Sequence, residues 1–366
     1  MNISKLEVLK VYGWNEQWIS IWNENKPGIP NLTPGRVTAQ FSHTYRIVTE
    51  LGERLARVTG KFDYTTQVRS HFPAVGDWVC AEILDDQQAV IHSVLPRYSA
   101  MTRKVAGQTT EQQVIGANLD ELFIVNALNL DFNLRKIERY LIMAWESGAR
   151  PIVVLTKADL SENTENRVSE VEAIAPGIPV HAVSALKNLG MDALTTYLIP
   201  EKTIAVIGSS GAGKSTLLNW LSGKENQRVQ GIREDDARGR HTTTHRELFV
   251  LPSGALLMDT PGMRELQLWD ARDGWQEAFS DIENMAAGCR FRDCRHQMEA
   301  GCAVKAAIQE GSLDPKRLIN YHKTERELDR AARKVKSAEQ RRSSSSDKRS
   351  GGHYRVYKLT DEYEEI

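Results

Sequence analysis

The segment GSSGAGKS, residues 208–215, has the residue types and spacing of a phosphate-binding loop, G-x-x-x-x-G-K-[ST]. The apolar stretch TIAVI precedes it and the helical pattern STLLNWL follows it, which is the context that this motif requires. Glycines let backbone N–H groups turn toward phosphate oxygens, Lys214 adds positive charge, and the Ser215 hydroxyl can ligate Mg²⁺. The predicted phosphate-binding residues are Gly208, Ser209, Ser210, Gly211, Ala212, Gly213, Lys214, Ser215 and Thr216.

A carboxylate follows the apolar stretch ALLM further along the chain. Asp259 can hold Mg²⁺ through water, together with Ser215, and the backbone N–H of Gly262 can sense a γ-phosphate. The intervening segment GIREDDARGRHTTTHRE is polar and weakly periodic, which is typical of a segment that becomes ordered when γ-phosphate and metal bind. Thr242 or Thr243 in this segment is the expected partner of Mg²⁺.

The stretch PIVVLTKADL indicates how a base would be recognised, because it reads as a buried strand that ends in Thr-Lys-Ala-Asp. The Asp159 carboxylate can accept from N1–H and the 2-amino group of guanine, whereas adenine has neither donor. In VSALK, Ser184 and Ala185 can supply a backbone N–H to guanine O6. The predicted guanine-binding residues are Thr156, Lys157, Ala158, Asp159, Ser184 and Ala185.

The residues expected to activate water are less well defined. Many GTPases place a Gln directly after Asp-x-x-Gly to orient the attacking water, and this chain has Met263 there. Because an apolar side chain cannot position water, we expect slow intrinsic hydrolysis and stimulation by a partner that completes the site. His241 and His245 flank the threonines; His241 is a candidate catalytic residue, with a plain surface histidine as the alternative.

Three of the four cysteines fall in the short stretch CRFRDCRHQMEAGC. Cys289, Cys294, His296 and Cys302 provide three thiolates and one imidazole, which complete a tetrahedral Zn²⁺ shell without an open position. One structural zinc ion is therefore expected, the alternative being free cysteines packed in a helix. The separate Cys80 lies on an apparent strand and is expected to be a small core residue.

Two basic stretches near the C-terminal end each have two alternative interpretations. Arg290, Arg292 and Arg295 lie between the predicted zinc ligands and suit phosphate contact, or form a solvated basic loop. Residues 321–350 read as a basic helix that runs into the Ser-rich text RRSSSSDKRSGG. This helix suits RNA contact, and a solvated helix with a disordered tail is the alternative.

The length of the chain and the pattern of its apolar residues indicate the elements that position these residues. The 366 residues suggest two or three domains, and the net charge of −1 neither indicates nor excludes nucleic acid. Residues 35–96 read as short strands with turn signals, typical of an OB-type barrel. From Leu119 buried strands alternate with amphipathic helices, which predicts a parallel α/β sheet.

Aromatic residues in the first third of the chain have two possible roles, packing and RNA binding. Trp14, Trp18, Ile21 and Trp22 lie on one face of a short helix that is expected to pack on a neighbouring domain. In the barrel, basic side chains mixed with aromatic ones suit RNA binding, although barrel cores also need aromatic residues. These barrel residues are Arg54, Arg57, Lys61, Arg69, Tyr45, Phe62, Tyr64 and Phe72.

The text MNISKLEVLKVYGW lacks the apolar core of a signal peptide, and no run reaches the length of a membrane span. We therefore expect a cytoplasmic protein without a membrane partner.

The order of the motifs is TKAD, SA, GSSGAGKST, HTTT, DTPG, whereas an ordinary GTPase begins with its phosphate loop. With FPAVGDWV, DFNLRKIERYL, GRHTTTH and the cysteine cluster, residues 35–320 resemble the circularly permuted, ribosome small-subunit-dependent GTPases of the RsgA (YjeQ) type. The resemblance implies a multidomain fold with an N-terminal OB-type β-barrel, a central permuted α/β P-loop GTPase domain and a C-terminal α-rich zinc domain. It also implies a monomer that hydrolyses GTP to GDP in late maturation of the small (30S) subunit, contacts 16S rRNA and is stimulated by the subunit.

Under this resemblance the expected domain limits can be stated. They are residues 1–34 for an N-terminal extension with a short helix, 35–98 for the barrel, 99–268 for the GTPase domain, 269–340 for the zinc domain and 341–366 for a flexible Ser-rich and acidic tail. One departure concerns Thr156, which stands where the family's guanine motif has Asn, and which predicts weaker guanine affinity. Competing interpretations are a nucleotide-binding module with little turnover and a P-loop ATPase or small-molecule kinase.

Overall fold

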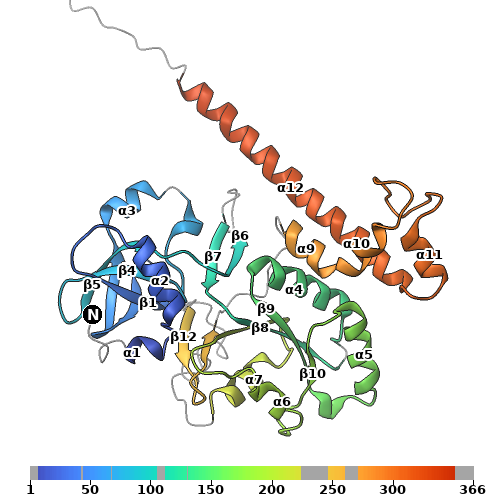
Figure 1. Ribbon diagram of the computed structural model, residues 1–366, viewed down its shortest axis with the longest axis horizontal. Helices are drawn as coiled ribbons and strands as arrows, with labels where there is room; N and C mark the ends of the chain where they lie inside the picture. Colours follow the sequence, from blue (N-terminus) through green and yellow to red (C-terminus); the bar gives the residue numbers. More distant parts are fainter. Residues whose placement is uncertain are drawn as a thin grey trace, which may run out of the picture.

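A computed structural model describes most of the chain. The described residues are 7–42, 44–66, 68–104, 112–129, 131–223, 246–259 and 271–350. Figure 1 shows a β-barrel beside an α/β domain, and a helical region from which the long helix α12 (Pro315–Ser350) projects. None of the described helices combines the length and the apolar character that crossing a bilayer requires.

The N-terminal barrel is closed by five strands. They are β1 (Leu32–Gln40), β2 (Tyr45–Thr49), β3 (Gly52–Val58), β4 (Trp78–Ile83) and β5 (Gln88–Val94). β1 pairs with β2 and β4, β2 with β3, and β4 with β5, all antiparallel, while β3 and β5 pair in parallel. This topology confirms the expected OB-type barrel.

The segment between β3 and β4 is helical where the sequence suggested strand. Thr59 caps α3 (Gly60–Thr65) through a hydrogen bond from the N–H of Phe62 to its hydroxyl, at 3.0 Å, and η2 (Arg69–His71) follows. The proposed RNA-binding aromatic residues therefore divide into two groups. Tyr45 is buried in the barrel core, whereas Tyr64 on α3 is 90% exposed.

The N-terminal tryptophans pack as expected against the barrel. α1 (Glu7–Lys10) precedes α2 (Glu16–Asn25), whose Trp18 and Trp22 are buried in one cluster with Trp14 and Trp78. The ring centroids of Trp14 and Trp78 lie 4.7 Å apart in an edge-to-face arrangement. Cys80 is buried in the same cluster, which agrees with its expected role as a core residue.

The α/β domain is built on a sheet of order β10-β9-β8-β11-β13-β12. The strands are β8 (Glu121–Ala127), β9 (Arg150–Thr156), β10 (Val180–Ala182), β11 (Thr203–Gly208), β12 (Arg246–Val250) and β13 (Leu256–Asp259). The helices are α4 (Leu134–Ser147), η3 (Ala158–Leu160), α5 (Thr164–Ile174), α6 (Asp192–Thr195) and α7 (Lys214–Leu221). All strand pairs are parallel except β12–β13, which places the chain ends after β8, β9, β11 and β13 at one edge of the sheet.

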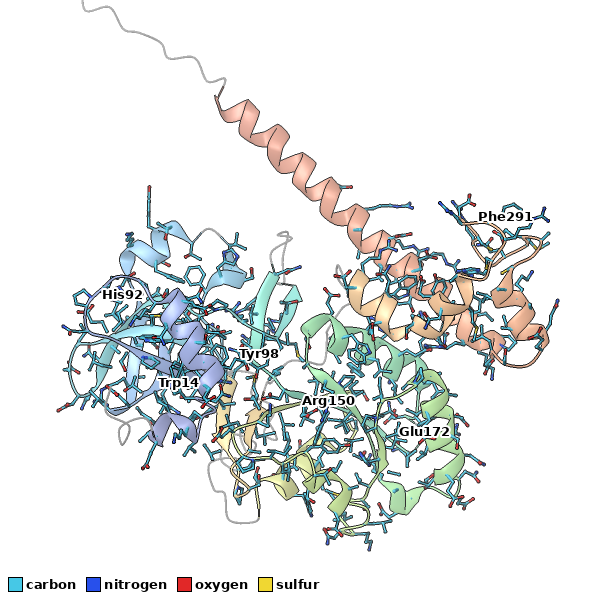
Figure 2. The ribbon with its side chains drawn as sticks, viewed as in Figure 1. Trp14, His92, Tyr98, Arg150, Glu172 and Phe291 are labelled. Atoms are coloured by element: carbon cyan, nitrogen blue, oxygen red, sulfur yellow. The ribbon has the colours of Figure 1, made fainter. Side chains whose placement is uncertain are left out.

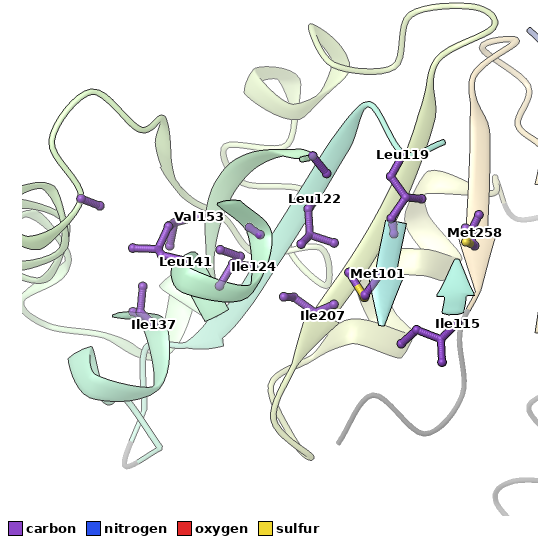
Figure 3. Close-up of a cluster of buried hydrophobic side chains, with 14 of the residues drawn as sticks. Met101, Ile115, Leu119, Leu122, Ile124, Ile137, Leu141, Val153, Ile207 and Met258 are labelled. Carbon is purple, nitrogen blue, oxygen red and sulfur yellow. The ribbon is translucent and has the colours of Figure 1, made fainter. Parts of the chain in front are cut away.

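Apolar residues cover both faces of this sheet. Leu122 and Ile124 of β8 face the cluster that contains Ile137 and Leu141 of α4, which Figure 3 shows beside Ile207 of β11. The alternate residues of β8 join a second cluster that covers the opposite face. A hairpin of β6 (Ala100–Lys104) and β7 (Gln112–Ala117) contributes to the edge of the first cluster.

Barrel and α/β sheet are joined into one sheet of eleven strands, which the sequence did not predict. β1 extends beyond β4 and pairs with β12 in antiparallel register, Ala39 opposite Glu247 and Gln40 opposite Arg246. An ion pair between Arg46 and Glu247, with N and O 2.6 Å apart, lies beside this junction.

The C-terminal region consists of α9 (Arg272–Ala278), α10 (Ser280–Ala286), α11 (Ala303–Gln309) and α12, and it is anchored on α4. Gly274 approaches α4 so closely that a Cβ atom there would lie 2.3 Å from the carbonyl oxygen of Ile142. The guanidinium of Arg317 donates to Glu138 of α4 at 2.8 Å and to Asp281 of α10 at 2.9 Å. α12 continues to Ser350, into the segment predicted as a flexible tail.

We expect Arg317→Leu to destabilise the anchoring of α12 by about 3–5 kcal/mol, because it leaves the buried Glu138 carboxylate without its cation. Hydrogen–deuterium exchange of the α12 amides measures this change. Arg272→Leu is the matched control; it breaks an exposed pair with Asp329 and should cost less than about 1 kcal/mol. Equal protection in the two variants would contradict the structural role of Arg317.

Candidate nucleotide-binding site and zinc centre

The predicted phosphate loop connects β11 to α7, and its glycines adopt conformations that other residues avoid. Gly208, Gly211 and Gly213 have φ angles of +152°, +78° and +85°. A Cβ atom on Gly208 would lie 2.2 Å from the carbonyl oxygen of Val125 on β8. The loop therefore approaches the neighbouring strand at a distance that only glycine permits.

Polar groups converge inside this loop. The Lys214 ammonium donates to the carbonyl oxygens of Gly208, at 2.8 Å, and Ser209, at 2.6 Å. The Ser209 hydroxyl is buried without a hydrogen-bond partner, while Ser215 and Thr216 at the start of α7 are exposed. A buried hydroxyl without a partner is costly, and a phosphate oxygen at the loop would satisfy it.

The guanine motif contacts the phosphate loop directly. The Thr156 hydroxyl donates to the carbonyl oxygen of Ala212 at 2.5 Å, and the Lys157 ammonium donates to that of Gly211 at 2.8 Å. The short Thr side chain reaches the loop because Gly213 leaves room; a Cβ atom there would lie 3.2 Å from the Thr156 hydroxyl oxygen. The residue that departs from the family pattern therefore keeps a hydrogen-bonded connection between base motif and phosphate loop.

The remaining residues predicted to recognise the base lie at the ends of β9 and β10. Lys157 has a left-handed backbone conformation, and the exposed Asp159 follows on η3. The Ala158 N–H donates to the carbonyl oxygen of Val183 at 3.1 Å, which holds the two strand ends together. The Ser184 N–H donates to Leu189 at 2.8 Å, which leaves the N–H of Ala185 as the candidate donor to guanine O6.

The structure describes some of the residues that were predicted to hold Mg²⁺. Asp259 is the last residue of β13, the strand beside β11, so its carboxylate lies at the same edge of the sheet as the phosphate loop. Other residues predicted for metal, γ-phosphate and water lie outside the described residues; they are His241, Thr242, Thr243, His245, Gly262 and Met263.

Two residues that the motifs did not identify lie next to the phosphate loop. Asn126 of β8 is fully buried, and neither atom of its amide group has a hydrogen-bond partner. Its sequence signal is a polar residue inside the apolar strand ELFIVNAL. Asp131 carries a carboxylate oxygen 3.8 Å from the position that a Cβ atom on Gly211 would occupy.

The cysteine cluster has dimensions that suit zinc. The four candidate ligand atoms of Cys289, Cys294, His296 and Cys302 all lie within 4.8 Å of one another. The distance from Sγ of Cys289 to Sγ of Cys302 is 3.9 Å, and the distances from His296 Nδ1 to these two sulfurs are 3.6 and 3.4 Å. A tetrahedral ion with ordinary Zn–S and Zn–N bonds requires separations of roughly 3.8 and 3.5 Å.

Burial lowers the pKa of His296, which keeps the imidazole neutral and able to ligate a metal. The arginines between the ligands are exposed, as expected: Arg290, Arg292 and Arg295. Phe291, which Figure 2 places at the outer end of the helical region, is 46% exposed and lies against the Arg290 guanidinium. The cluster thus forms a basic knuckle around a closed ligand set.

Comparison with known proteins gives consistent matches. Residues 94–269 match the sequence model of the RsgA GTPase family. The small ribosomal subunit biogenesis GTPase RsgA of Opitutus terrae is 45% identical over 315 residues, which cover 83% of this chain and 86% of that protein. RsgA 2 of Vibrio vulnificus is 49% identical over 276 residues, covering 75% and 78%.

Solved structures agree with these matches. YjeQ from Thermotoga maritima superposes with a TM-score of 0.63 and 27% identity, over 81% of this chain and 98% of that one. YloQ, described as a circularly permuted GTPase, has a TM-score of 0.59 and 25% identity, over 83% and 98%. A second sequence model, ABC transporter, matches residues 191–361; this range contains the phosphate loop but not the guanine motif.

For the zinc centre, we expect Cys302→Ala to lose bound zinc on dialysis against a chelator, because three ligands remain and one side of the ion opens to water. Wild-type protein should retain about one ion per chain. Elemental analysis by mass spectrometry measures the content. Cys80→Ala removes a buried thiol far from the cluster in sequence and should keep its zinc. Zinc-free wild-type protein, freshly purified, would contradict the site.

Proposed function

This chain belongs to the RsgA GTPase family, and we propose that it hydrolyses GTP to GDP and phosphate during late maturation of the small (30S) ribosomal subunit. The observation that carries the proposal is the contact between guanine motif and phosphate loop, in which Thr156 and Lys157 bond to Ala212 and Gly211. This contact sets the base-binding and phosphate-binding groups in one site, as a GTPase requires.

Binding is divided between the two halves of the site. The Asp159 carboxylate accepts from guanine N1–H and the 2-amino group, and the Ala185 N–H donates to O6. The loop N–H groups and the Lys214 ammonium hold the phosphates. Nucleotide phosphates would draw this ammonium away from the carbonyl oxygens of Gly208 and Ser209 that it now contacts.

Two metals are assigned from the ligand chemistry of the chain. Mg²⁺ with GTP is held by the Ser215 hydroxyl and, through water, by Asp259, with Thr242 or Thr243 as a further ligand. When bound, Mg²⁺ neutralises charge on the phosphates. Zinc is held by the cluster around His296 and fixes the fold of the C-terminal region.

Hydrolysis depends on a partner. Met263 cannot orient water, so the chain alone turns over GTP slowly, and His241 is the candidate residue that acts in the stimulated site. The proposed partner is the small subunit with its 16S rRNA, met in the cytoplasm by a monomer of this chain. Asp159 favours guanine over adenine, which distinguishes this proposal from an ATPase or kinase.

We expect GTP hydrolysis to be slow for the isolated protein and at least about tenfold faster with purified small subunits. Release of phosphate under single-turnover conditions measures both rates. Asp159→Asn should abolish the preference for GDP over ADP in displacing a labelled guanine nucleotide, because an amide oxygen is a single uncharged acceptor. Fast hydrolysis without any partner, or no change on adding subunits, would argue against the proposed function.

We expect Thr156→Val to weaken GDP binding about tenfold, because the Ala212 carbonyl loses its donor at a cost of about 1–3 kcal/mol. Titration with a fluorescent GDP analogue gives the affinity. Thr156→Ser keeps the hydroxyl and should bind within about twofold of wild type. Thr196→Val is the matched control, since its exposed hydroxyl donates only to Ala193. If valine and serine bind GDP equally, the hydroxyl does not support the site.

A further inference from the structure

A groove runs between the first turn of α4 and the N-terminal half of α12. Its narrower part has a volume of about 420 Å³ and is lined by Arg135, Lys323, Arg326, Glu327 and Arg330. A wider part of about 820 Å³ adjoins it, because Arg135 and Lys323 line both cavities. Every residue that lines the narrower part is charged, which sets it apart from an apolar ligand pocket.

The groove carries an excess of positive charge that the surrounding chain leaves uncompensated. Within the described residues, the side chains of Arg135, Lys323 and Arg330 have no hydrogen bond or ion pair, and Arg326 bonds only to a backbone carbonyl. The single carboxylate, Glu327, accepts from Nη1 of Arg139 with both oxygens, at 2.7 and 2.6 Å. Its charge is therefore already balanced.

The wider part of the groove also has more unpaired cations than unpaired carboxylates among the described residues. Lys316 adds another cation, while each acidic residue already has a partner. Glu170 pairs with Arg167 at 3.0 Å, Asp281 pairs with Arg317, and Asp314 accepts from the backbone N–H of Lys316 at 2.7 Å. A backbone N–H does not neutralise the Asp314 carboxylate, so an anionic ligand entering here would meet three cations without an ion pair, Arg135, Lys316 and Lys323, against this one uncompensated carboxylate among the described residues.

The cations are held on a rigid support. Lys323, Arg326 and Arg330 occupy positions i, i+3 and i+7 of α12, so they lie on one face over about 10 Å. The Arg317–Glu138 bond fixes this part of α12 against α4, where Arg135 stands in the first turn. A row of cations at fixed spacing in a groove suits a row of phosphates better than a single small anion.

We propose that this groove binds the phosphodiester backbone of folded RNA through Arg135, Lys323, Arg326 and Arg330. Recognition is by charge and shape, since guanidinium and ammonium groups donate to phosphate oxygens without reading bases. That the RNA belongs to the small subunit rests on the proposed function; the binding of RNA itself does not. Phe132, which lines the wider part of the groove, follows Asp131, whose carboxylate oxygen lies 3.8 Å from the position that a Cβ atom on Gly211 would occupy.

The test uses the full chain with Lys323→Gln and Arg330→Gln combined. Both side chains are exposed and unpaired, so the fold should be unaffected, which a thermal melt checks. The probe is a fluorescein-labelled RNA hairpin of about 20 nucleotides, followed by anisotropy across a range of salt concentrations. We expect at least about tenfold weaker binding, and a salt slope smaller by roughly two, one for each lost phosphate contact.

The matched control combines Lys10→Gln and Lys26→Gln, which removes the same charge from exposed positions of the N-terminal helices and should change the affinity less than about twofold. An unchanged salt slope in the groove variant would overturn the proposal. So would polyglutamate displacing the hairpin as well as unlabelled RNA, which would indicate an acidic protein partner. If the groove variant loses hairpin binding but small subunits do not stimulate the wild type, the proposed function is wrong and the RNA-binding groove stands.

Discussion

The hydrogen bond from the Thr156 hydroxyl to the Ala212 carbonyl is the contact on which the candidate nucleotide site depends. It spans the end of β8, because the strands that carry base motif and phosphate loop are not neighbours in the sheet. Residues 156 and 212 are also 56 positions apart, so the chain itself does not hold them together. A buried, short hydrogen bond to a backbone carbonyl, with room provided by Gly213, supplies the alignment.

The permuted order gives each part of the site a different covalent neighbour. β8 and β9, which lead to the base motif, follow the β6–β7 hairpin and the barrel, while β13 with Asp259 leads toward α9 and the cysteine cluster. α4 connects these parts in space, since it packs on β8 and holds Arg317 through Glu138. The Asp259 side and the base-motif side of the candidate site are therefore covalently continuous with different domains, although the sheet itself is that of an ordinary parallel α/β domain.

Short local patterns predicted most of the candidate site. The phosphate loop, the Thr-Lys-Ala-Asp turn and the cysteine cluster each depend on residues close in sequence, and the structure brings each of them together. Contacts between distant segments were not predictable: the β1–β12 junction depends on the pairing of two strand edges, and the Arg317 network on three helices. The helix α3 was missed although its Thr59 cap is a local signal, three residues from its partner Phe62. The weaker guanine affinity expected from Thr156 stays a prediction; the facing Gly213, which motif spacing does not reveal, lets this short side chain reach the Ala212 carbonyl.

The junction between β1 and β12 has a consequence for how the protein is made. Gln40 and its partner Arg246 are 206 residues apart, so the barrel strands leave the ribosome long before β12 exists. At 5–20 residues per second, the outer half of β1 waits roughly 10–40 s with unpaired backbone groups. Such an open edge can pair with another nascent chain. The more slowly the α/β domain is translated, the longer this edge of β1 stays exposed.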